Sequence, residues 1–342
     1  MAVDAGDDAP PEAIDLAATA DYVAAVQRED GLIPWYRDGP ADPWDHVEAA
    51  MGLSVGGRHD AAEAAYRWLA DVQLDDGSWP ATYEGPNPAR NAHRETHHAA
   101  YVATGVWHHY RVTGDAAFLE SMWPTVEAGL DFALDWQVET GEVYWAVAPD
   151  GRPYEDALLT GSSSVYKSVE CGLAAADVLD RSRPDWAAAH DRLGEAIRAR
   201  PDCFDRSWES KRGYSMDWFY PALCGAVTGE SARDRLAAER GRFLERGLGC
   251  RCVADEPWVT VAETAELVAA MAAAGSNGEA AEVLGWLGRF RDDDGAYWTG
   301  YQFEHDAVWP EKRPTWTAGA VLLAADAVAG VTPAADFFGP GR

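Results

Sequence analysis

Apolar residues recur along the chain in segments of helical length, and loops rich in Gly, Pro and Trp separate these segments. The segments come in pairs. The first of each pair is apolar nearly all round, as in 321–324, and the second carries many charges, as in 233–240. A helix that is apolar all round is buried, whereas a helix with one apolar stripe lies in an outer layer. The pattern therefore predicts alternating inner and outer helices.

Glycine and proline residues mark the expected ends of these helices. The sixth inner helix has no long partner after it, so we expect the missing outer helix at about 12–27, where it would close a ring. The predicted inner helices span about 45–55, 93–113, 161–180, 216–228, 259–274 and 315–329, and the outer helices that follow the first five span about 59–74, 116–137, 184–199, 230–246 and 277–291.

Six helical hairpins in a row predict an all-α fold, the (α/α)6 barrel, in which the N-terminal helix completes the outer layer. No sustained alternating run of β-branched residues is present, so strands should be few and confined to loops. We expect residues 12–342 to form a single domain because no linker interrupts them. Residues 1–11, rich in Ala and Asp, are expected to be a disordered lead-in.

The formal net charge is −29, and lysine occurs only at positions 167, 211 and 312. Such an acidic, lysine-poor surface is typical of a protein adapted to high salt, where self-repulsion is screened. An acidic enzyme encoded by a GC-rich genome is the alternative. Nucleic acid is excluded as a partner because no basic face could neutralise its phosphates.

The sequence shows no signal peptide and no apolar stretch long enough to span a membrane. Five cysteines are an odd number without framework spacing, which fits a reducing cytoplasm. One close pair, Cys250 and Cys252, lacks the second pair that a zinc site requires. We therefore expect a cytoplasmic protein without a metal or cofactor.

Each inner helix follows a loop that is rich in polar and aromatic residues. Because the six loops occupy matching points of the repeat, their side chains should converge on one end of the ring, where helix N-termini favour anions. The six loop exits read Pro43-Trp44-Asp45-His46, His93-Arg94-Glu95-Thr96-His97, Gly161-Ser162-Ser163-Ser164, Met216-Asp217-Trp218, Trp258-Val259-Thr260 and Pro314-Thr315-Trp316-Thr317.

The segment Gln73-Leu74-Asp75-Asp76-Gly77-Ser78-Trp79 resembles the QW repeat of terpene cyclases and protein prenyltransferases. Segments that begin at Gln27, Gln137 and Asp294 resemble the same repeat less closely. In that repeat the Gln side chain ties a turn and the Trp packs, so the resemblance implies architecture more than chemistry. No Asp-x-Asp-Asp acid lies at an inner helix, and no zinc ligands of a prenyltransferase can be placed.

The segment 300–306, Gly-Tyr-Gln-Phe-Glu-His-Asp, followed by Pro314-Thr315-Trp316-Thr317-Ala318, resembles the last loop of the six-hairpin glycosidases of the glucoamylase and trehalase type. The resemblance implies that Glu304 is the general base, and that Asp45 grips sugar hydroxyls. His305 replaces the family's Gln. The family's general acid follows a Leu-Trp, whereas here Ala146 follows Trp145. Glu142, Glu155 or Asp156 in the same loop is then expected to supply the acid.

Hydrolysis with inversion requires two carboxyl groups about 6.5–9.5 Å apart, one protonated and one ionised. Tryptophan faces would stack on the sugar rings, and acids and histidines would bind the hydroxyls. The residues expected to bind substrate are Trp44, Asp45, His46, Trp79, Glu95, His97, Trp145, Tyr166, Asp217, Trp218, Trp258, Glu263, Tyr301, His305 and Trp316.

Several of these residues also have a purely structural interpretation. Asp45 can cap its helix, and acids such as Glu95, Asp217 and Glu263 are favoured in a first turn by the helix dipole alone. His93 and His97 have the spacing of a helical metal pair, but His-x-Glu-x-His is not the order found in zinc proteases.

Three functional hypotheses follow from the sequence. The first is a glycoside hydrolase that acts on an α-linked oligosaccharide or glycoconjugate, with the enzymes of a glycosylation pathway as possible partners. The second is an isoprenoid-handling protein of the cyclase or prenyltransferase type. The third is a six-hairpin protein that binds glycans without turnover.

Overall fold

The computed structural model describes residues 14–85, 87–89 and 92–339. The lead-in predicted at residues 1–11 lies outside the described residues. Within the described part of the chain, no helix combines the length and the apolar character needed to cross a membrane.

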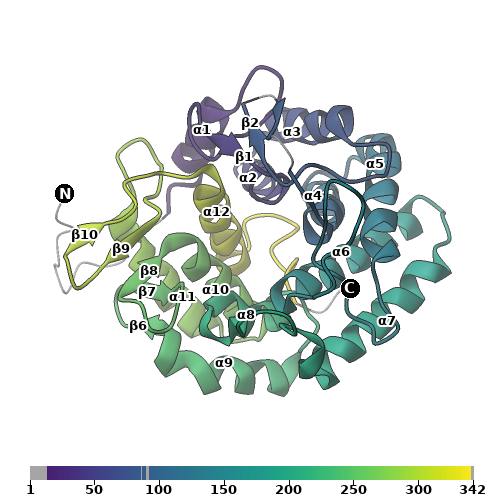
Figure 1. Ribbon diagram of the computed structural model, residues 1–342. Helices are drawn as coiled ribbons and strands as arrows, with labels where there is room; N and C mark the ends of the chain where they lie inside the picture. Colours follow the sequence, from purple (N-terminus) through teal and green to yellow (C-terminus); the bar gives the residue numbers. More distant parts are fainter. Residues whose placement is uncertain (1–13, 86, 90–91, 340–342) are drawn as a thin grey trace.

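The described residues form twelve α-helices that alternate between an inner and an outer layer (Figure 1). The inner helices are α2 (Pro43–Val55), α4 (Thr96–Thr113), α6 (Leu159–Val178), α8 (Ser215–Leu223), α10 (Val261–Ala273) and α12 (Thr315–Ala329). The outer helices are α1 (Leu16–Val26), α3 (His59–Val72), α5 (Ala116–Asp135), α7 (Pro184–Ala199), α9 (Gly229–Phe243) and α11 (Asn277–Trp286). Nearly all of α2 is buried, whereas α9 buries only Ala232, Leu236 and Phe243, as their apolar patterns predict.

The inner helices form a closed ring. Each packs against the next in chain order, and α12 packs against α2. The outer helix α1 packs against both α12 and α2, which confirms the predicted position of the N-terminal helix. Glycines allow the close approach of α2 and α12. A β-carbon on Gly52 would lie 2.7 Å from the Cα of Gly319, so larger residues would push these helices apart.

The inner helix α8 is shorter than expected, since it ends at Leu223 rather than near 228. Pro221 lies in its last turn, and Gly225 takes a left-handed conformation with φ 75° directly afterwards. A proline followed by a left-handed glycine stops a helix early. The other predicted helix ends agree with the structure to within a few residues, apart from α11, whose last turn becomes a short 3-10 helix, Leu287–Phe290.

The glutamines of the QW-like segments tie neighbouring hairpins together. The Nε2 of Gln73 donates to the carbonyls of Gly77, at 2.9 Å, and of Thr125 in α5, at 3.0 Å. Gln27 makes the same pair of bonds toward α3, and Gln137 makes them toward α7. Each turn is thereby bound to the next outer helix.

Glycine is required in these turns for two reasons. Gly77 has φ 86°, and a β-carbon on it would lie 2.2 Å from the Ala128 carbonyl oxygen of α5. The corresponding contact of Gly295 is with Ala18 in α1, at 2.4 Å. The turn after α11 therefore packs on α1 as the earlier turns pack on later outer helices, so α1 takes the place of the missing sixth outer helix.

The ten strands of the described residues contain two or three residues each and lie in the loops. The first sheet joins β1 (Pro40–Ala41), β2 (Tyr83–Glu84) and β3 (Asn87–Pro88), and the second joins β4 (Arg94–Glu95) and β5 (Ala146–Val147). The third runs in the order β10 (Ala307–Val308), β9 (Gly300–Gln302), β8 (Trp258–Thr260), β7 (Gly249–Arg251) and β6 (Leu244–Glu245), and it projects outside the helices in Figure 1. All strand pairs are antiparallel.

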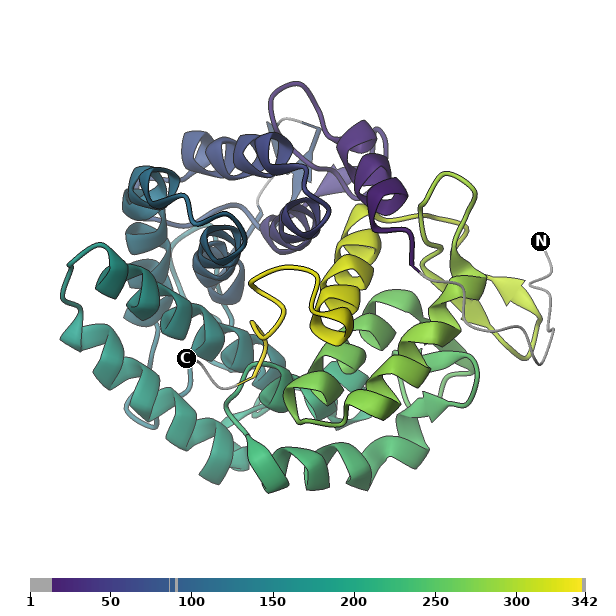
Figure 2. The same ribbon diagram turned by 180° about the vertical axis from the view of Figure 1, so that it is seen from behind.

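The segment after α12 crosses the ring at the end opposite to the inner-helix N-termini (Figure 2). Gly339 donates its N–H to the Leu223 carbonyl at the end of α8, and its own carbonyl accepts from Lys167 Nζ of α6 at 3.1 Å. Phe337 is buried against His108 of α4. This C-terminal segment closes one end of the ring, so the loops at the other end, here called the N-terminal rim, frame the accessible site.

Candidate active site

Four carboxyl groups project from two inner helices toward the centre of the ring. Asp45 and Glu263 are the third residues of α2 and α10, and Glu48 and Glu266 follow nearly one turn deeper. The Glu48 carboxylate is repelled by Glu263 although α12 stands between the two helices in the ring. The acids of α2 and α10 therefore meet over the ring centre. Glu48 is buried, while the other three remain partly accessible.

The N-cap of α2 is Asp42 rather than Asp45. Its Oδ1 accepts from the Asp45 N–H at 2.9 Å, and its Oδ2 accepts from the Trp35 indole at 2.7 Å. Because Asp42 performs the capping that was one interpretation of Asp45, the Asp45 side chain is available for another purpose.

Burial and mutual repulsion hold protons on these acids. Burial, then Asp42 and Glu48, raises the pKa of Asp45 well above its usual range. Burial raises the pKa of Glu48 to about 8, with Glu263 and Asp42 adding to the effect. Burial and Glu48 likewise raise the pKa of Glu266. At neutral pH Asp45, Glu48 and Glu266 can therefore act as proton donors.

Aromatic residues lie beside the two deeper acids, Glu48 and Glu266. Trp44 stacks on Tyr101 of α4 with ring centroids 4.5 Å apart, and it lies 6.0 Å from Tyr220 of α8. The Tyr101 hydroxyl donates to Glu48 at 3.4 Å, and the Tyr220 hydroxyl donates to Glu266. These contacts fix the deeper pair of glutamates between tyrosines.

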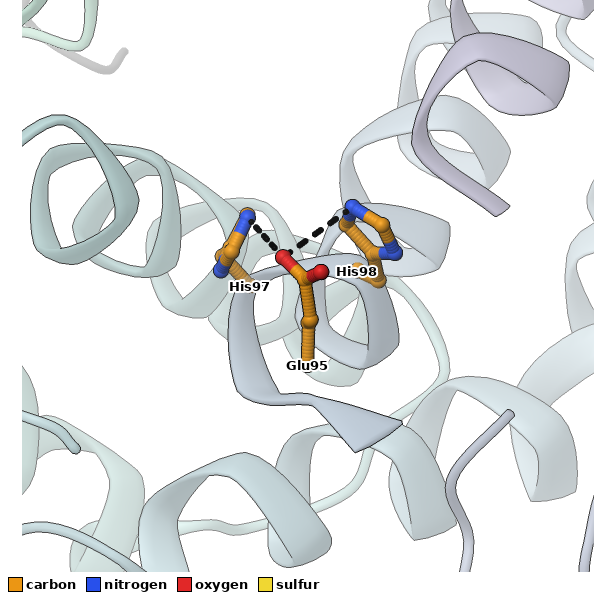
Figure 3. A group of neighbouring side chains, drawn as sticks. All are labelled: Glu95, His97 and His98. Atoms are coloured by element: carbon orange, nitrogen blue, oxygen red, sulfur yellow. Dashed lines mark ion pairs between the residues drawn. The ribbon is translucent and has the colours of Figure 1, made fainter. Parts of the chain in front are cut away.

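Beside Trp44, the start of α4 carries a carboxylate among three histidines (Figure 3 shows Glu95, His97 and His98). Glu95 lies 2.9 Å from His93 Nε2, 3.0 Å from His97 Nε2 and 3.5 Å from His98 Nε2. Burial opposes ionisation of Glu95, but His98 and the hydrogen bonds from His93 and His97 hold its pKa below the usual range. Glu95 is therefore ionised, in contrast to Asp45, Glu48 and Glu266 at the ring centre.

Glu95, His97 and His98 are also the residues that could hold a metal ion, since one ligand atom from each lies within 4.8 Å of the others. Two observations disfavour this use. The histidine Nε2 atoms already point at the carboxylate, and the buried Nδ1 atoms of His97 and His98 have no protein hydrogen-bond partner. Metal-bound histidines normally donate their second N–H to such a partner.

The structure does not place Glu304 at this site. It lies in the exposed turn of the β9–β10 hairpin, in which Ala307 pairs with Gln302. That hairpin belongs to the sheet outside the helices (Figure 1). The expectation that Glu304 is the general base of this site was therefore wrong, because a place just before the sixth inner helix does not fix the direction of a long loop. His305 is exposed in the same turn.

The acids of the 142–156 loop are not placed as proton donors either. Glu142 is fully buried, 3.1 Å from Arg206. Asp156 accepts hydrogen bonds from Ala157, Arg206 and Ser207, and although burial opposes ionisation these bonds lower its pKa. A lowered pKa is the opposite of what a general acid needs. Glu155 is exposed.

Several predicted sugar-binding aromatic residues have structural roles instead. Trp79 is buried, and its indole donates to the Leu69 carbonyl at 2.9 Å. Trp218 stacks on Phe243 between α8 and α9. Tyr166 stacks on His190 at 3.9 Å, between α6 and α7.

The same holds for three further residues. His46 accepts from the Ile33 N–H and contacts the Ala65 carbonyl, and burial lowers its pKa to about 4. Trp258 and Tyr301 belong to the outer sheet, where the Trp258 indole donates to the Trp309 carbonyl and the Tyr301 hydroxyl donates to Asp306.

Other predicted residues do lie on inner-helix starts or beside them. Trp44, Asp45, Glu95, His97 and Glu263 come together as described above. Trp316 is the second residue of α12 and packs edge-on against Trp35 at 5.5 Å between ring centroids. Trp145 lies 5.3 Å from His93. Asp217 is buried near the start of α8, where burial and Asp205 raise its pKa to about 6.

Five residues of the site were missed from the sequence: Glu48, His98, Tyr101, Tyr220 and Glu266. The overlooked signal is the i, i+3 spacing of Asp45 with Glu48 and of Glu263 with Glu266 in otherwise apolar helices. Two acids three residues apart share one helix face, and on an inner helix an acidic face can only point to the ring centre.

No protein-family model matches the chain. Among solved structures, the fold is similar to a glycosidase (TM-score 0.68, 16% identity, 93% of this chain and 97% of that one). It is also similar to a sugar epimerase from a ruminal bacterium (TM-score 0.67, 15% identity, 90% and 95%) and to a D-mannose isomerase (TM-score 0.67, 10% identity, 91% and 95%). At these identities the likeness shows the fold alone.

A much stronger similarity exists at the level of sequence. Over 320 residues the chain is 45% identical to the MMP endo-(1,4)-3-O-methyl-alpha-D-mannosidase of Mycolicibacterium hassiacum, which covers 94% of this chain and 88% of that protein. The aligned region spans nearly the whole of both proteins. The chain therefore belongs to the glycoside hydrolase family of that endo-mannosidase.

Proposed function

We propose that this glycoside hydrolase cleaves α-(1,4) bonds within chains of 3-O-methyl-mannose. The single observation that carries the proposal is the cluster of Asp45, Glu48, Glu263 and Glu266 at the ring centre, with raised pKa values on three of the four acids. The substrate comes from the relative, which is an endo-(1,4)-3-O-methyl-alpha-D-mannosidase by name. The cluster supplies the carboxyl groups that glycoside hydrolysis needs.

The finer architecture is also a proposal. We infer an (α/α)6 barrel of the six-hairpin glycosidase type, formed as a single domain by residues 12–342. The closed ring of inner helices and the packing of α1 on α12 support it. We likewise propose a cytoplasmic location and association with enzymes of a glycosylation pathway.

We assign catalysis to Asp45 and Glu263, because both lie in a first turn at the same depth and both are partly accessible. Protonated Asp45 donates its proton to the glycosidic oxygen as the bond to the anomeric carbon breaks. Ionised Glu263 takes a proton from a water molecule, and the water oxygen bonds to the anomeric carbon from the opposite face. The expected product is the inverted anomer.

The surroundings support this division of roles. Cys252 is hydrogen-bonded to Glu263, and burial together with that carboxylate raises the pKa of the thiol. The thiol therefore stays protonated and can donate a hydrogen bond to the Glu263 carboxylate, which holds that side chain in place. The deeper Glu48 and Glu266 are held by Tyr101 and Tyr220, which suits a supporting role below the substrate.

The test compares Asp45→Asn and Glu263→Gln with the matched control Glu304→Gln. Each of the first two variants should lower kcat on 3-O-methyl-mannose oligosaccharides by about 10²–10⁴-fold. Their melting temperatures should stay near that of the wild type, and the control should keep full activity. NMR of the first product should show inversion.

Three results would count against the proposal. Full activity of either catalytic-site variant would remove the assigned residue from the mechanism. A retained anomer would replace inversion by a double displacement. Binding without hydrolysis by the wild-type protein would replace the enzyme by a glycan-binding protein, the third hypothesis drawn from the sequence.

A further inference from the structure

Four aromatic side chains form a row along the N-terminal rim. Trp145 and Tyr154 come from the loop before α6, and Trp208 and Tyr214 come from the loop before α8. Trp145 lies 5.3 Å from Tyr154 and 5.6 Å from Trp208 between ring centroids. The Lys211 ammonium lies over both Trp208, at 5.7 Å, and Tyr214, at 5.4 Å. We call these four side chains the rim aromatic row.

The row meets the candidate active site at both ends. At one end His93 packs edge-on against Trp145 and contacts Glu95, which lies beside Trp44. At the other end Tyr214 pairs with Val253. The next residue, Ser215, donates its N–H to the Cys252 carbonyl, and Cys252 adjoins Glu263. The row therefore connects the start of α4 with the neighbourhood of Glu263.

Two aromatic side chains of the row are exposed to solvent, although aromatic residues are usually buried. Tyr154 is 43% exposed and Tyr214 is 44% exposed, and both are among the few large hydrophobic residues of the described chain that face solvent. Trp145 and Trp208 are half-buried. In a chain with net charge −29, the charged side chain found above these rings is a lysine. Exposed apolar patches with polar neighbours mark binding surfaces.

We propose that the rim aromatic row holds successive sugar units of the substrate beyond the bond that is cut. The idea rests on the proposed function, and it specifies that the substrate is a long chain rather than a disaccharide. The apolar face of a pyranose carries C–H groups of partial positive charge, which suit the negative face of an aromatic ring. A methyl ether replaces a hydroxyl donor with further apolar surface, so a methylated mannose chain fits this row better than an unmethylated one.

The rim aromatic row is continuous with the carboxyl cluster, and this continuity favours a polysaccharide over a second copy of the chain as the molecule that covers the row. A second copy of this chain could also cover exposed aromatic residues. Such a contact would not require the row to reach the candidate active site at both His93 and Cys252. A bound polysaccharide would need both, because its chain must enter and leave the catalytic centre. Chain length of the ligand is therefore the property to measure.

The experiment uses Tyr154→Ala and Trp208→Ala, with Trp309→Ala as the matched control. Trp309 is 57% exposed but lies next to the outer β10 strand. With Asp45→Asn present in every protein to prevent cleavage, titration calorimetry should give affinities for a short and a long 3-O-methyl-mannose oligosaccharide. We expect each row variant to weaken binding of the long ligand about three- to tenfold, the effect of one aromatic contact, and to leave the short ligand unchanged. The control should change neither.

A loss of affinity that is equal for both lengths, or equally large in the control, would overturn the proposal, as would unchanged binding of the long ligand. Because Trp208 also donates to Asp205 at 3.0 Å, Tyr154→Ala provides the second variant should the loop of the first be disturbed. Light scattering should show the same mass for the wild type and Tyr154→Ala; a change in mass would assign the row to contacts between copies. Hydrolysis of the short ligand tests the proposed function separately, since it depends on Asp45 and Glu263.

Discussion

The acids at the ring centre show how burial and like charge act together on single residues. Glu48 is buried with its carboxyl near Tyr101, and its pKa is about 8 against an ordinary value of 4.5. Because the folded protein binds this proton more tightly than the unfolded chain, Glu48 contributes stability that is fully present below about pH 4.5. That contribution is lost as the pH rises toward about 8.

We therefore expect Glu48→Gln to flatten the pH dependence of stability. In the wild type the free energy of unfolding should fall between about pH 4.5 and 8, and each pKa unit corresponds to about 1.4 kcal/mol. Glutamine keeps an acceptor for Tyr101 but does not titrate, so the variant should lose less stability over this range, by on the order of 2–4 kcal/mol. Urea unfolding at several pH values measures this. Parallel curves for the two proteins would show that Glu48 does not hold the proton.

At the scale of elements, the glutamine side chains that follow outer helices join each helical hairpin to the next one in the ring. The Gln73 side chain bridges its own turn and α5 through two hydrogen bonds to partly buried carbonyls. Gln73→Ala should destabilise the protein by about 1–3 kcal/mol, because the two hydrogen bonds that join the turn to α5 would be lost. The control Gln302→Ala removes one local bond to the His305 N–H in the exposed β9–β10 hairpin and should cost less. Equal losses of melting temperature in the two variants would contradict the bridging role.

The whole molecule carries 57 acidic against 28 basic side chains, Lys and Arg together. Repulsion among exposed acids should destabilise the fold at low ionic strength. The Debye length falls from about 10 Å at 0.1 M salt to about 3 Å at 1 M, so molar salt should screen most of this repulsion. We expect the melting temperature to rise over that range in NaCl and to rise less in sucrose of matched osmolality. A melting temperature that does not change with salt concentration would favour an ordinary acidic enzyme over a protein adapted to high salt.

At this scale the C-terminal segment and the loops make the two ends of the ring different. Residues 331–339 close one end through Phe337 and Gly339. The carboxyl groups and the rim aromatic row lie toward the other end. A ring that is closed on one side presents its acids to a substrate lying across the N-terminal rim, which suits cleavage within a chain.

The helices follow from the sequence because their signals are local. Apolar periodicity, the glycines at turns such as Gly77 and the unpaired last helix determined twelve helices and their inner or outer position. These features depend on residues within a few turns of one another. The local pattern also predicted that Asp45, Glu95 and Glu263 lie at or beside the starts of inner helices, where the structure has them.

Only the tertiary structure decided which acids face one another. Glu263 lies in the first turn of α10, and Glu304 lies in the loop before α12. A long loop can point toward the ring centre or away from it, and the β9–β10 hairpin carries Glu304 outward. Glu48 and Glu266 became part of the site only because the ring brings α2 and α10 to one centre. The pKa of a buried acid depends on neighbours distant in the chain, so no local pattern in the sequence contains it.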